Sequence, residues 1–114
     1  MKDIIKLDVE SKNLTVLEAL ATVEMEIETL KLGGESLLKI VHGYGSKGVG
    51  GNIKKALLAH LKILKKHKKI CDFFACEKFC ITHKNYKIYI KKYPNLLVDG
   101  NIKNLNPGAT IVIL

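Results

Sequence analysis

The sequence predicts an α/β fold, in which a small mixed four-stranded sheet packs against two main helices. Short apolar runs alternate with two longer segments of helical periodicity, in the order β-α-β-α-β, and one further strand ends the chain. The 114 residues, 47% of them hydrophobic, match the size of one globular domain. We therefore expect a single domain over residues 1–114, with right-handed crossovers between parallel strands.

The first strand is expected over residues 4–9 and the first helix over residues 15–31. Thr15 and Glu18 have the spacing of a capping box, in which two unpaired N–H groups at a helix N-terminus are satisfied reciprocally. Apolar residues then recur every three or four positions as far as the glycine pair at 33–34, which is typical of a helix C-terminus.

The middle of the chain predicts a strand, a loop, a helix and another strand. Residues 37–41 are mostly apolar and predict a buried central strand. After a glycine-rich loop, residues 51–67 place apolar side chains on one helical face and lysines off it, which predicts the second helix. A third strand is expected over residues 70–75.

The last part of the chain is less regular. Residues 86–91 fit either an alternating strand or a short helix that ends before Pro94, and the helix is the preferred interpretation. Residues 100–107 are expected to form a loop. The final apolar run, residues 109–114, predicts the last strand.

The net charge of +8 is unevenly distributed along the chain. Residues 1–35 hold eight acidic residues and four lysines, a balance of −4, whereas residues 36–114 hold three acidic residues and fifteen lysines, a balance of +12. No arginine occurs. Lysine suits phosphate as a point charge but lacks the fork that reads guanine bidentately. The pattern predicts a polyanionic partner, DNA or RNA, held through its backbone.

The loop over residues 42–51 is the strongest candidate for a binding site. It follows a predicted strand and leads into the lysine-rich helix. Glycines let backbone N–H groups approach a ligand closely, and the first N–H groups of a helix carry its positive dipole end. This combination favours an anion such as phosphate. The alternative is a loop that only turns the chain from strand to helix.

Other site types are less well supported by the sequence. Gly43-x-Gly45-x-x-Gly48 formally matches a dinucleotide fingerprint, but no acidic residue ends the next predicted strand about 20 residues on. Cys71, Cys76 and Cys80 do not have the usual spacing of a zinc site, so small buried or half-buried thiols are expected. The chain lacks an apolar signal segment and a run of about 18 apolar residues, and we expect a free-standing cytoplasmic protein with no membrane partner.

Three segments together resemble the Smr (small MutS-related) domain family. They are the central His42-Gly43-x-Gly45 followed by Gly51-x-Ile53-Lys54-x-Ala56-Leu57, the opening Leu7-Asp8-Val9, and the closing Pro107-Gly108-Ala109-Thr110-Ile111-Val112. The resemblance covers nearly the whole chain. It implies a fold similar to that of the C-terminal domain of bacterial initiation factor three. It also implies nucleic-acid binding and, as in several members of the family, DNA nicking or RNA cleavage.

The resemblance also suggests site residues. The catalytic candidates are Asp8, Glu10 and His42. The nucleic-acid-binding candidates are His42, Gly43, Tyr44, Gly45, Lys47, Lys54 and Lys55. Tyr44, which stands where the family often has lysine or arginine, would stack on a base.

The opening motif departs from the family, because Glu10 stands where a histidine is usual. Nucleic-acid binding therefore carries over better than cleavage. No cofactor is assigned, but if the chain is catalytic we expect Mg²⁺ or Mn²⁺, since Asp8 and Glu10, two residues apart on a strand, would point to one face and share the ion. The alternative function is a non-catalytic protein-interaction module with a basic face. The oligomeric state stays open.

Overall fold

A computed structural model describes residues 4–43 and 49–114, and within them one mixed sheet contains four strands in the order β1-β2-β4-β3. The strands are β1 (Ile5–Asp8), β2 (Leu37–Val41), β3 (Asp72–Ala75) and β4 (Ala109–Ile113). β1 and β2 are parallel, and β4 lies antiparallel between β2 and β3. The predicted mixed sheet and its central strand at 37–41 are confirmed.

The helices fall into a long pair and a group of short segments. They are α1 (Val16–Leu32), α2 (Val49–Lys66), the 3₁₀ turn η1 (Cys76–Lys78), α3 (Tyr86–Lys92), the 3₁₀ turn η2 (Pro94–Val98) and α4 (Gly100–Lys103). The two predicted main helices and the preferred helix at 86–91 are confirmed. In the described ranges, no helix has both the length and the apolar character needed to cross a bilayer.

The ends of α1 follow directly from local sequence. The Thr15 hydroxyl accepts a hydrogen bond from the Glu18 backbone N–H, and the Glu18 carboxylate accepts one from the Thr15 N–H, so the predicted capping box is present. At the other end Gly33 is the C-cap, and Gly34 has a φ of +77°. Glycine takes this left-handed conformation without the penalty of a Cβ.

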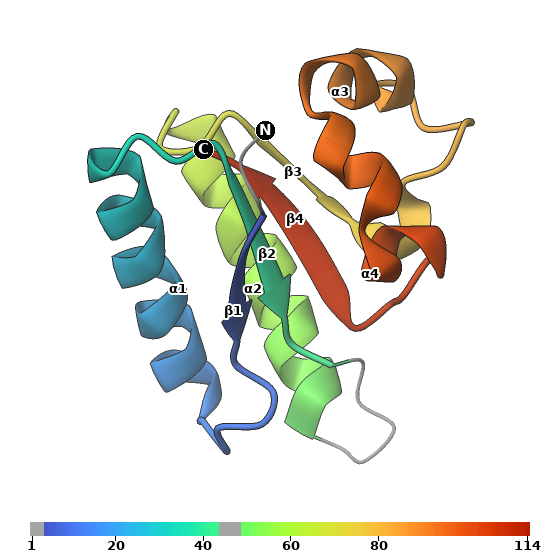
Figure 1. The fold of residues 1–114 in the computed structure, drawn as a ribbon. Coiled ribbons are helices and arrows are strands. Elements are labelled where there is room, and N and C mark those ends of the chain that lie inside the picture. The colour runs from blue at the N-terminus through green and yellow to red at the C-terminus, as the bar shows by residue number, and fades with distance from the viewer. Residues whose placement is uncertain (1–3, 44–48) are drawn as a thin grey trace.

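α1 and α2 lie side by side against one face of the sheet (Figure 1). Their apolar faces form one core with alternate residues of the strands, including Leu38 and Ile40 of β2 and Val112 of β4. Because alternate residues of a strand point to opposite faces, β2 directs Leu37, Lys39 and Val41 to the other side of the sheet. The two buried faces explain why residues 37–41 are almost uniformly apolar.

A second core covers the opposite face and is built by the chain from η1 to α4 (Figure 1). Phe79 and Leu96 are fully buried there beside Phe74 of β3. Lys39 reaches into this layer, where its ammonium group lies 2.8 Å from the Asp99 carboxylate and 2.7 Å from the Asn101 amide oxygen. These contacts fasten the α4 segment to the central strand.

The structure corrects two of the predicted boundaries and the expected burial of one cysteine. Residues 100–107 are not all loop, because the Asp99 carboxylate accepts a hydrogen bond from the Ile102 N–H and caps α4. The strand predicted over 70–75 begins only at Asp72. Cys71 therefore lies outside it and is exposed, whereas Cys76 is fully buried as expected.

Candidate nucleic-acid interface

The parallel pairing of β1 and β2 brings the opening motif next to the glycine loop. Asp8 lies opposite Val41 at the carboxyl ends of these strands, and the Val9 N–H donates to the Val41 carbonyl at 2.9 Å. The residues that follow each strand, Glu10 and His42, therefore start from neighbouring positions. Ligands of open α/β sheets bind at this end of the strands.

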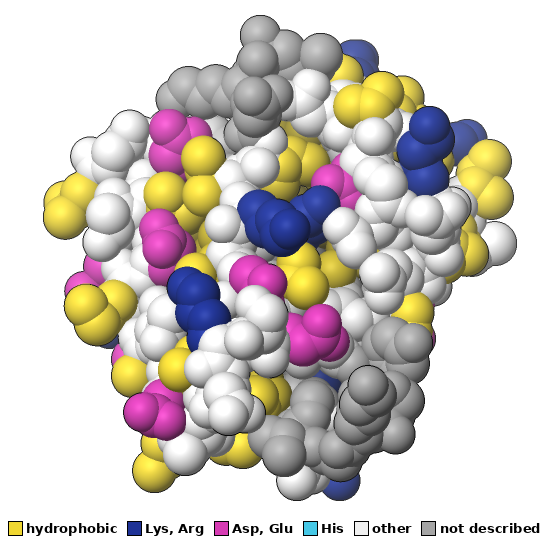
Figure 2. All heavy atoms as spheres, turned by 60° about the horizontal axis from the view of Figure 1, so that its bottom comes forward, with side chains coloured by type: hydrophobic (Ala, Val, Ile, Leu, Met, Phe, Trp, Pro, Cys, Tyr) yellow, Lys and Arg dark blue, Asp and Glu magenta, His cyan; other side chains and the backbone are white. Residues whose placement is uncertain are grey.

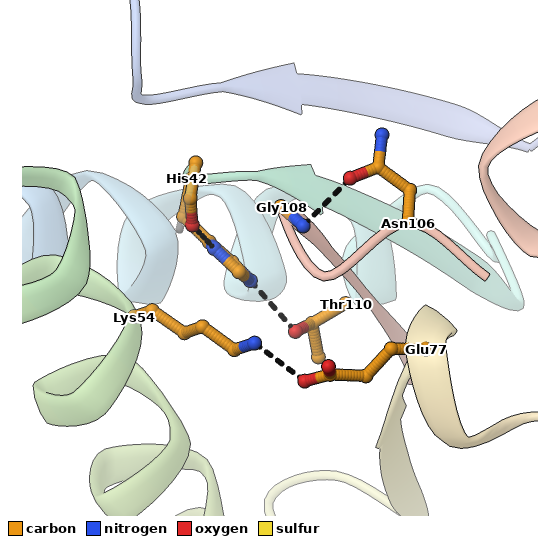
Figure 3. A network of polar contacts seen from close by, with 7 residues as sticks. His42, Lys54, Glu77, Asn106, Gly108 and Thr110 are labelled. Carbon is orange, nitrogen blue, oxygen red and sulfur yellow. Dashed lines mark hydrogen bonds and ion pairs between the residues drawn. The ribbon is translucent and has the colours of Figure 1, made fainter. Parts of the chain in front are cut away.

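The His42 side chain is completely buried directly after β2. Its Nδ1 lies 2.6 Å from the Gly43 carbonyl oxygen, and its Nε2 lies 2.8 Å from the Thr110 hydroxyl (Figure 3). The backbone N–H groups of His42 and Gly43 both donate to the Gly108 carbonyl. The first two residues of the loop are thus held to the turn before β4 by both main chain and side chain.

These contacts define the tautomer of the neutral His42 ring. A carbonyl only accepts, so Nδ1 carries the proton and donates to Gly43, and Nε2 accepts from the Thr110 hydroxyl. Burial lowers the pKa of His42, and the Lys54 ammonium lowers it further, whereas the hydrogen bond to Gly43 and the Glu77 carboxylate oppose the shift. A neutral imidazole with both nitrogens occupied positions the loop. Its direct contact with phosphate and its acid role stay predictions.

Gly43 and Glu10 lie in close contact. Gly43 has a φ of +75°, and a Cβ added there would lie 2.0 Å from the Glu10 carboxylate oxygen Oε2. The absence of a side chain at Gly43 therefore lets the Glu10 carboxylate lie against the loop backbone. The Glu10 side chain therefore reaches the start of the glycine loop.

The Asp8 carboxylate is directed into its own turn. It accepts hydrogen bonds from the N–H groups of Glu10 and Ser11 and from the Ser11 hydroxyl, at 2.7–3.0 Å. The pKa of Asp8 is lowered, chiefly by the Ser11 N–H and then by its hydroxyl. β1 ends at Asp8, so the expectation that Asp8 and Glu10 share one strand face is wrong.

The two candidate lysines of α2 lie in different environments. The Lys54 ammonium is half-buried and lies 2.5 Å from the Glu77 carboxylate of η1, below the His42–Thr110 pair (Figure 3). Lys55 is exposed. Glu77 was not anticipated from the sequence, where a single acid after a strand carries no signal. Tyr44, Gly45 and Lys47, three further candidates, lie outside the described residues.

The surface at this end of the molecule is mixed in charge. Lysine and acidic side chains are interspersed on the face that Figure 2 shows, which turns the lower end of Figure 1 toward the viewer. In the ranges 4–43 and 49–114, no three histidine, cysteine, aspartate or glutamate side chains gather into a group able to hold a metal ion. A phosphate would have to meet lysines here beside carboxylates such as Glu10.

The fold has a counterpart among solved structures. The crystal structure of the Smr domain of Thermus thermophilus MutS2 matches with a TM-score of 0.59 and 22% sequence identity, over 97% of this chain and 98% of that one. The chain has the Smr fold. No protein-family model and no curated protein matches the sequence. The shared fold therefore agrees with the resemblance that the sequence motifs suggested, over 97% of the chain.

Proposed function

We propose that this Smr-fold domain binds nucleic acid through its sugar-phosphate backbone, at the carboxyl ends of β1 and β2 and the first turns of α2. The observation that carries the proposal is the position of exposed Lys55 in the first two turns of α2, the helix that follows the strand end anchored by His42. The unpaired backbone N–H groups at the start of a helix, together with a nearby lysine, favour the binding of phosphate.

The site favours binding over cleavage. Both ring nitrogens of His42 are hydrogen bonded, and the Asp8 carboxylate stabilises a turn. Glu10 is the exposed acid of the site. It would act in hydrolysis only with a divalent cation between it and the phosphate, because two negative groups repel each other. Nicking by this domain, if present, is therefore proposed to require Mg²⁺ or Mn²⁺.

The binding proposal is tested by fluorescence anisotropy with labelled branched DNA and structured RNA over a range of salt concentrations. Affinity should fall steeply with salt, and Lys55→Ala should weaken binding and lower the salt slope by about 1. Lys87→Ala, which removes an exposed lysine of α3, is the matched control and should bind as the unaltered protein does. Binding that does not change with salt would contradict the proposal.

Cleavage is tested separately with the same substrates in Mg²⁺, in Mn²⁺ and in EDTA. Glu10→Gln keeps the size of the exposed acidic side chain and removes its charge, so it tests the acid that would act with the cation and leaves the turn capped by Asp8 intact. The proposal expects no product in EDTA and no product from Glu10→Gln, with binding retained. Full-rate nicking in EDTA would show that the metal requirement is wrong.

A further inference from the structure

A groove of about 750 Å³ runs along the outer edge of β3, on the opposite side of α2 from α1. β3 is the last strand of the sheet order, so this edge is not covered by another strand. Phe73 and Phe74 point to opposite faces of the sheet, and both border the groove. The groove therefore straddles the strand edge, with α2 forming one wall and the segment from Glu77 to His83 contributing to the other.

Aliphatic side chains of α2 form one wall of the groove, and aromatic and charged side chains complete its lining. Leu58 and Ile63 project from α2, and Ile63 is 52% exposed although it is a large hydrophobic residue. Ala75 closes the floor beside them. The Phe74 ring is buried and stacks on Phe79 with a centroid separation of 4.1 Å, so its face is already occupied. Phe73 packs against the core between α1, α2 and the sheet, and the His83 ring is tilted against Phe74. The apolar lining therefore suits amino-acid side chains better than nucleobases, which stack on open aromatic faces.

The charge around the groove is positive. Lys62 and Lys66 line the α2 wall and Lys78 lines the η1 side, all three exposed. In the described ranges no ion pair involves these three lysines. The carboxylate of the lining residue Glu77 is already paired with Lys54. A partner with carboxylates would therefore meet lysines that have no competing intramolecular anion.

The backbone of β3 offers a template for an added strand. In the part of the chain described, no backbone hydrogen bond joins β3 to any segment other than β4. One edge donor is occupied internally, because the Phe73 N–H donates to the Asp72 carboxylate at 2.8 Å. Because the N–H and C=O groups of alternate residues point to the same side of a strand, the groups left for pairing are the Phe73 carbonyl and the N–H and carbonyl of Ala75. Strand addition derives affinity from main-chain hydrogen bonds and specificity from pockets for alternate side chains.

From the free edge, the apolar lining and the lysine rim together, we propose that β3 is a docking site for an extended acidic peptide, whose aliphatic side chains enter the groove and whose carboxylates meet Lys62, Lys66 and Lys78. This site lies at the C-terminal half of α2 and is separate from the nucleic-acid site proposed at its N-terminal end.

The test is selection of a displayed library of random octapeptides on the whole protein, followed by affinity measurement with the enriched peptides. Acidic peptides with alternating aliphatic residues should be enriched, and they should shift the backbone amide resonances of residues 73–75. Ile63→Glu should weaken their binding about tenfold or more. Met25→Glu, at another exposed hydrophobic position, 70% exposed on α1, should leave it unchanged. Lys62→Glu should weaken binding, and Lys12→Glu should not.

Several results would overturn the proposal. They are the absence of any enriched peptide, enrichment of neutral or basic sequences, or acidic peptides that bind Ile63→Glu and the unaltered protein equally. A 12-nucleotide single strand that shifts the resonances of residues 73–75 and displaces the peptide would assign the groove to nucleic acid instead. Circular dichroism of each variant confirms that the comparison is between folded proteins.

Discussion

The imidazole of His42, directly after β2, and the hydroxyl of Thr110, near the start of β4, are joined by a 2.8 Å hydrogen bond. Both groups are fully buried. Since Nδ1 is already donating to the Gly43 carbonyl, the Thr110 hydroxyl is the donor to Nε2. The start of the glycine loop is thereby fixed to the closing segment of the chain, and the pair is open to direct test.

Thr110→Val removes this donor while keeping the shape of the side chain. The buried Nε2 of His42 then has no partner, and we expect the free energy of unfolding to fall by about 1–3 kcal/mol. Urea denaturation measures the change. Thr110→Ser keeps the hydroxyl and loses one methyl group, so its loss should be smaller, about 1 kcal/mol. An unchanged free energy of unfolding in Thr110→Val would show that the hydrogen bond contributes nothing.

The lowered pKa of His42 predicts a pH dependence of stability. Its folded pKa lies below the ordinary value of 6.5, so at mildly acidic pH the unfolded chain takes up a proton that the folded chain does not. The contribution of neutral His42 is complete above pH 6.5 and is lost as the pH falls toward the folded pKa. Asp8, Glu18 and Asp72, whose pKa values are also lowered, titrate below this window.

Urea denaturation of the unaltered protein and of His42→Gln between pH 7.5 and about 5 measures this dependence. The loss of stability on acidification should be smaller in His42→Gln, which cannot be protonated. NMR titration of the imidazole gives an independent readout, with the midpoint for His42 expected below 6.5. A midpoint above that value would contradict the burial-based prediction.

Gly43→Ala should destabilise the fold through two separable effects. The positive φ costs a non-glycine residue about 1–2 kcal/mol, and the new Cβ must displace the Glu10 carboxylate. Gly34→Ala carries the same φ penalty, at +77°, with no atom within 4 Å of the new Cβ, and so isolates the first effect. Gly43→Ala should therefore be the more destabilising of the two.

The additional loss of stability in Gly43→Ala should disappear when Glu10 is also replaced by alanine. In the double-mutant cycle we expect a coupling energy of about 0.5–1 kcal/mol between positions 10 and 43. Urea denaturation of the four proteins supplies it. A coupling energy of zero would mean that the Glu10 side chain moves aside freely and that its contact with the loop does not contribute to stability.

The Lys39–Asp99 pair should contribute strongly to the attachment of α4. Their side chains are only 13% and 8% exposed, so Lys39→Met leaves a largely buried carboxylate without its cation. We expect a loss of about 3 kcal/mol, with faster hydrogen exchange in residues 99–103. Lys6→Met, at the exposed position paired with Lys39 in the β1–β2 register, is the control and should change stability by no more than about 0.5 kcal/mol.

The elements that the sequence predicted well depend on neighbours along the chain. The capping box of α1 spans four residues, and the turn of Asp8 spans four, so both can be understood from local sequence. The apolar run of 37–41 predicted a buried central strand because only a strand covered on both faces is apolar at nearly every position. The Smr-like motifs joined these pieces into a topology that the structure confirms.

The site itself depends on pairings between residues far apart in the chain. His42 meets Thr110 across 68 positions, Lys54 meets Glu77 across 23, and Lys39 meets Asp99 across 60. Nothing in the local sequence around Glu77 or Asp99 indicates a partner, because long-range ion pairs are selected by the packing of the layers that carry them. The short helix α4 was missed for the same reason, since its capping residue is itself held by Lys39.

The sequence by itself thus determined the order of the elements, the caps of α1, the buried central strand and the basic character of α2. The tertiary structure alone decided that the His42 ring faces the interior, that Glu10 rests on Gly43 and that β3 lies at an open edge. Local hydrogen bonds and periodicity depend on residues close together in the chain. Burial and electrostatic partners are decided only when the sheet brings distant segments together.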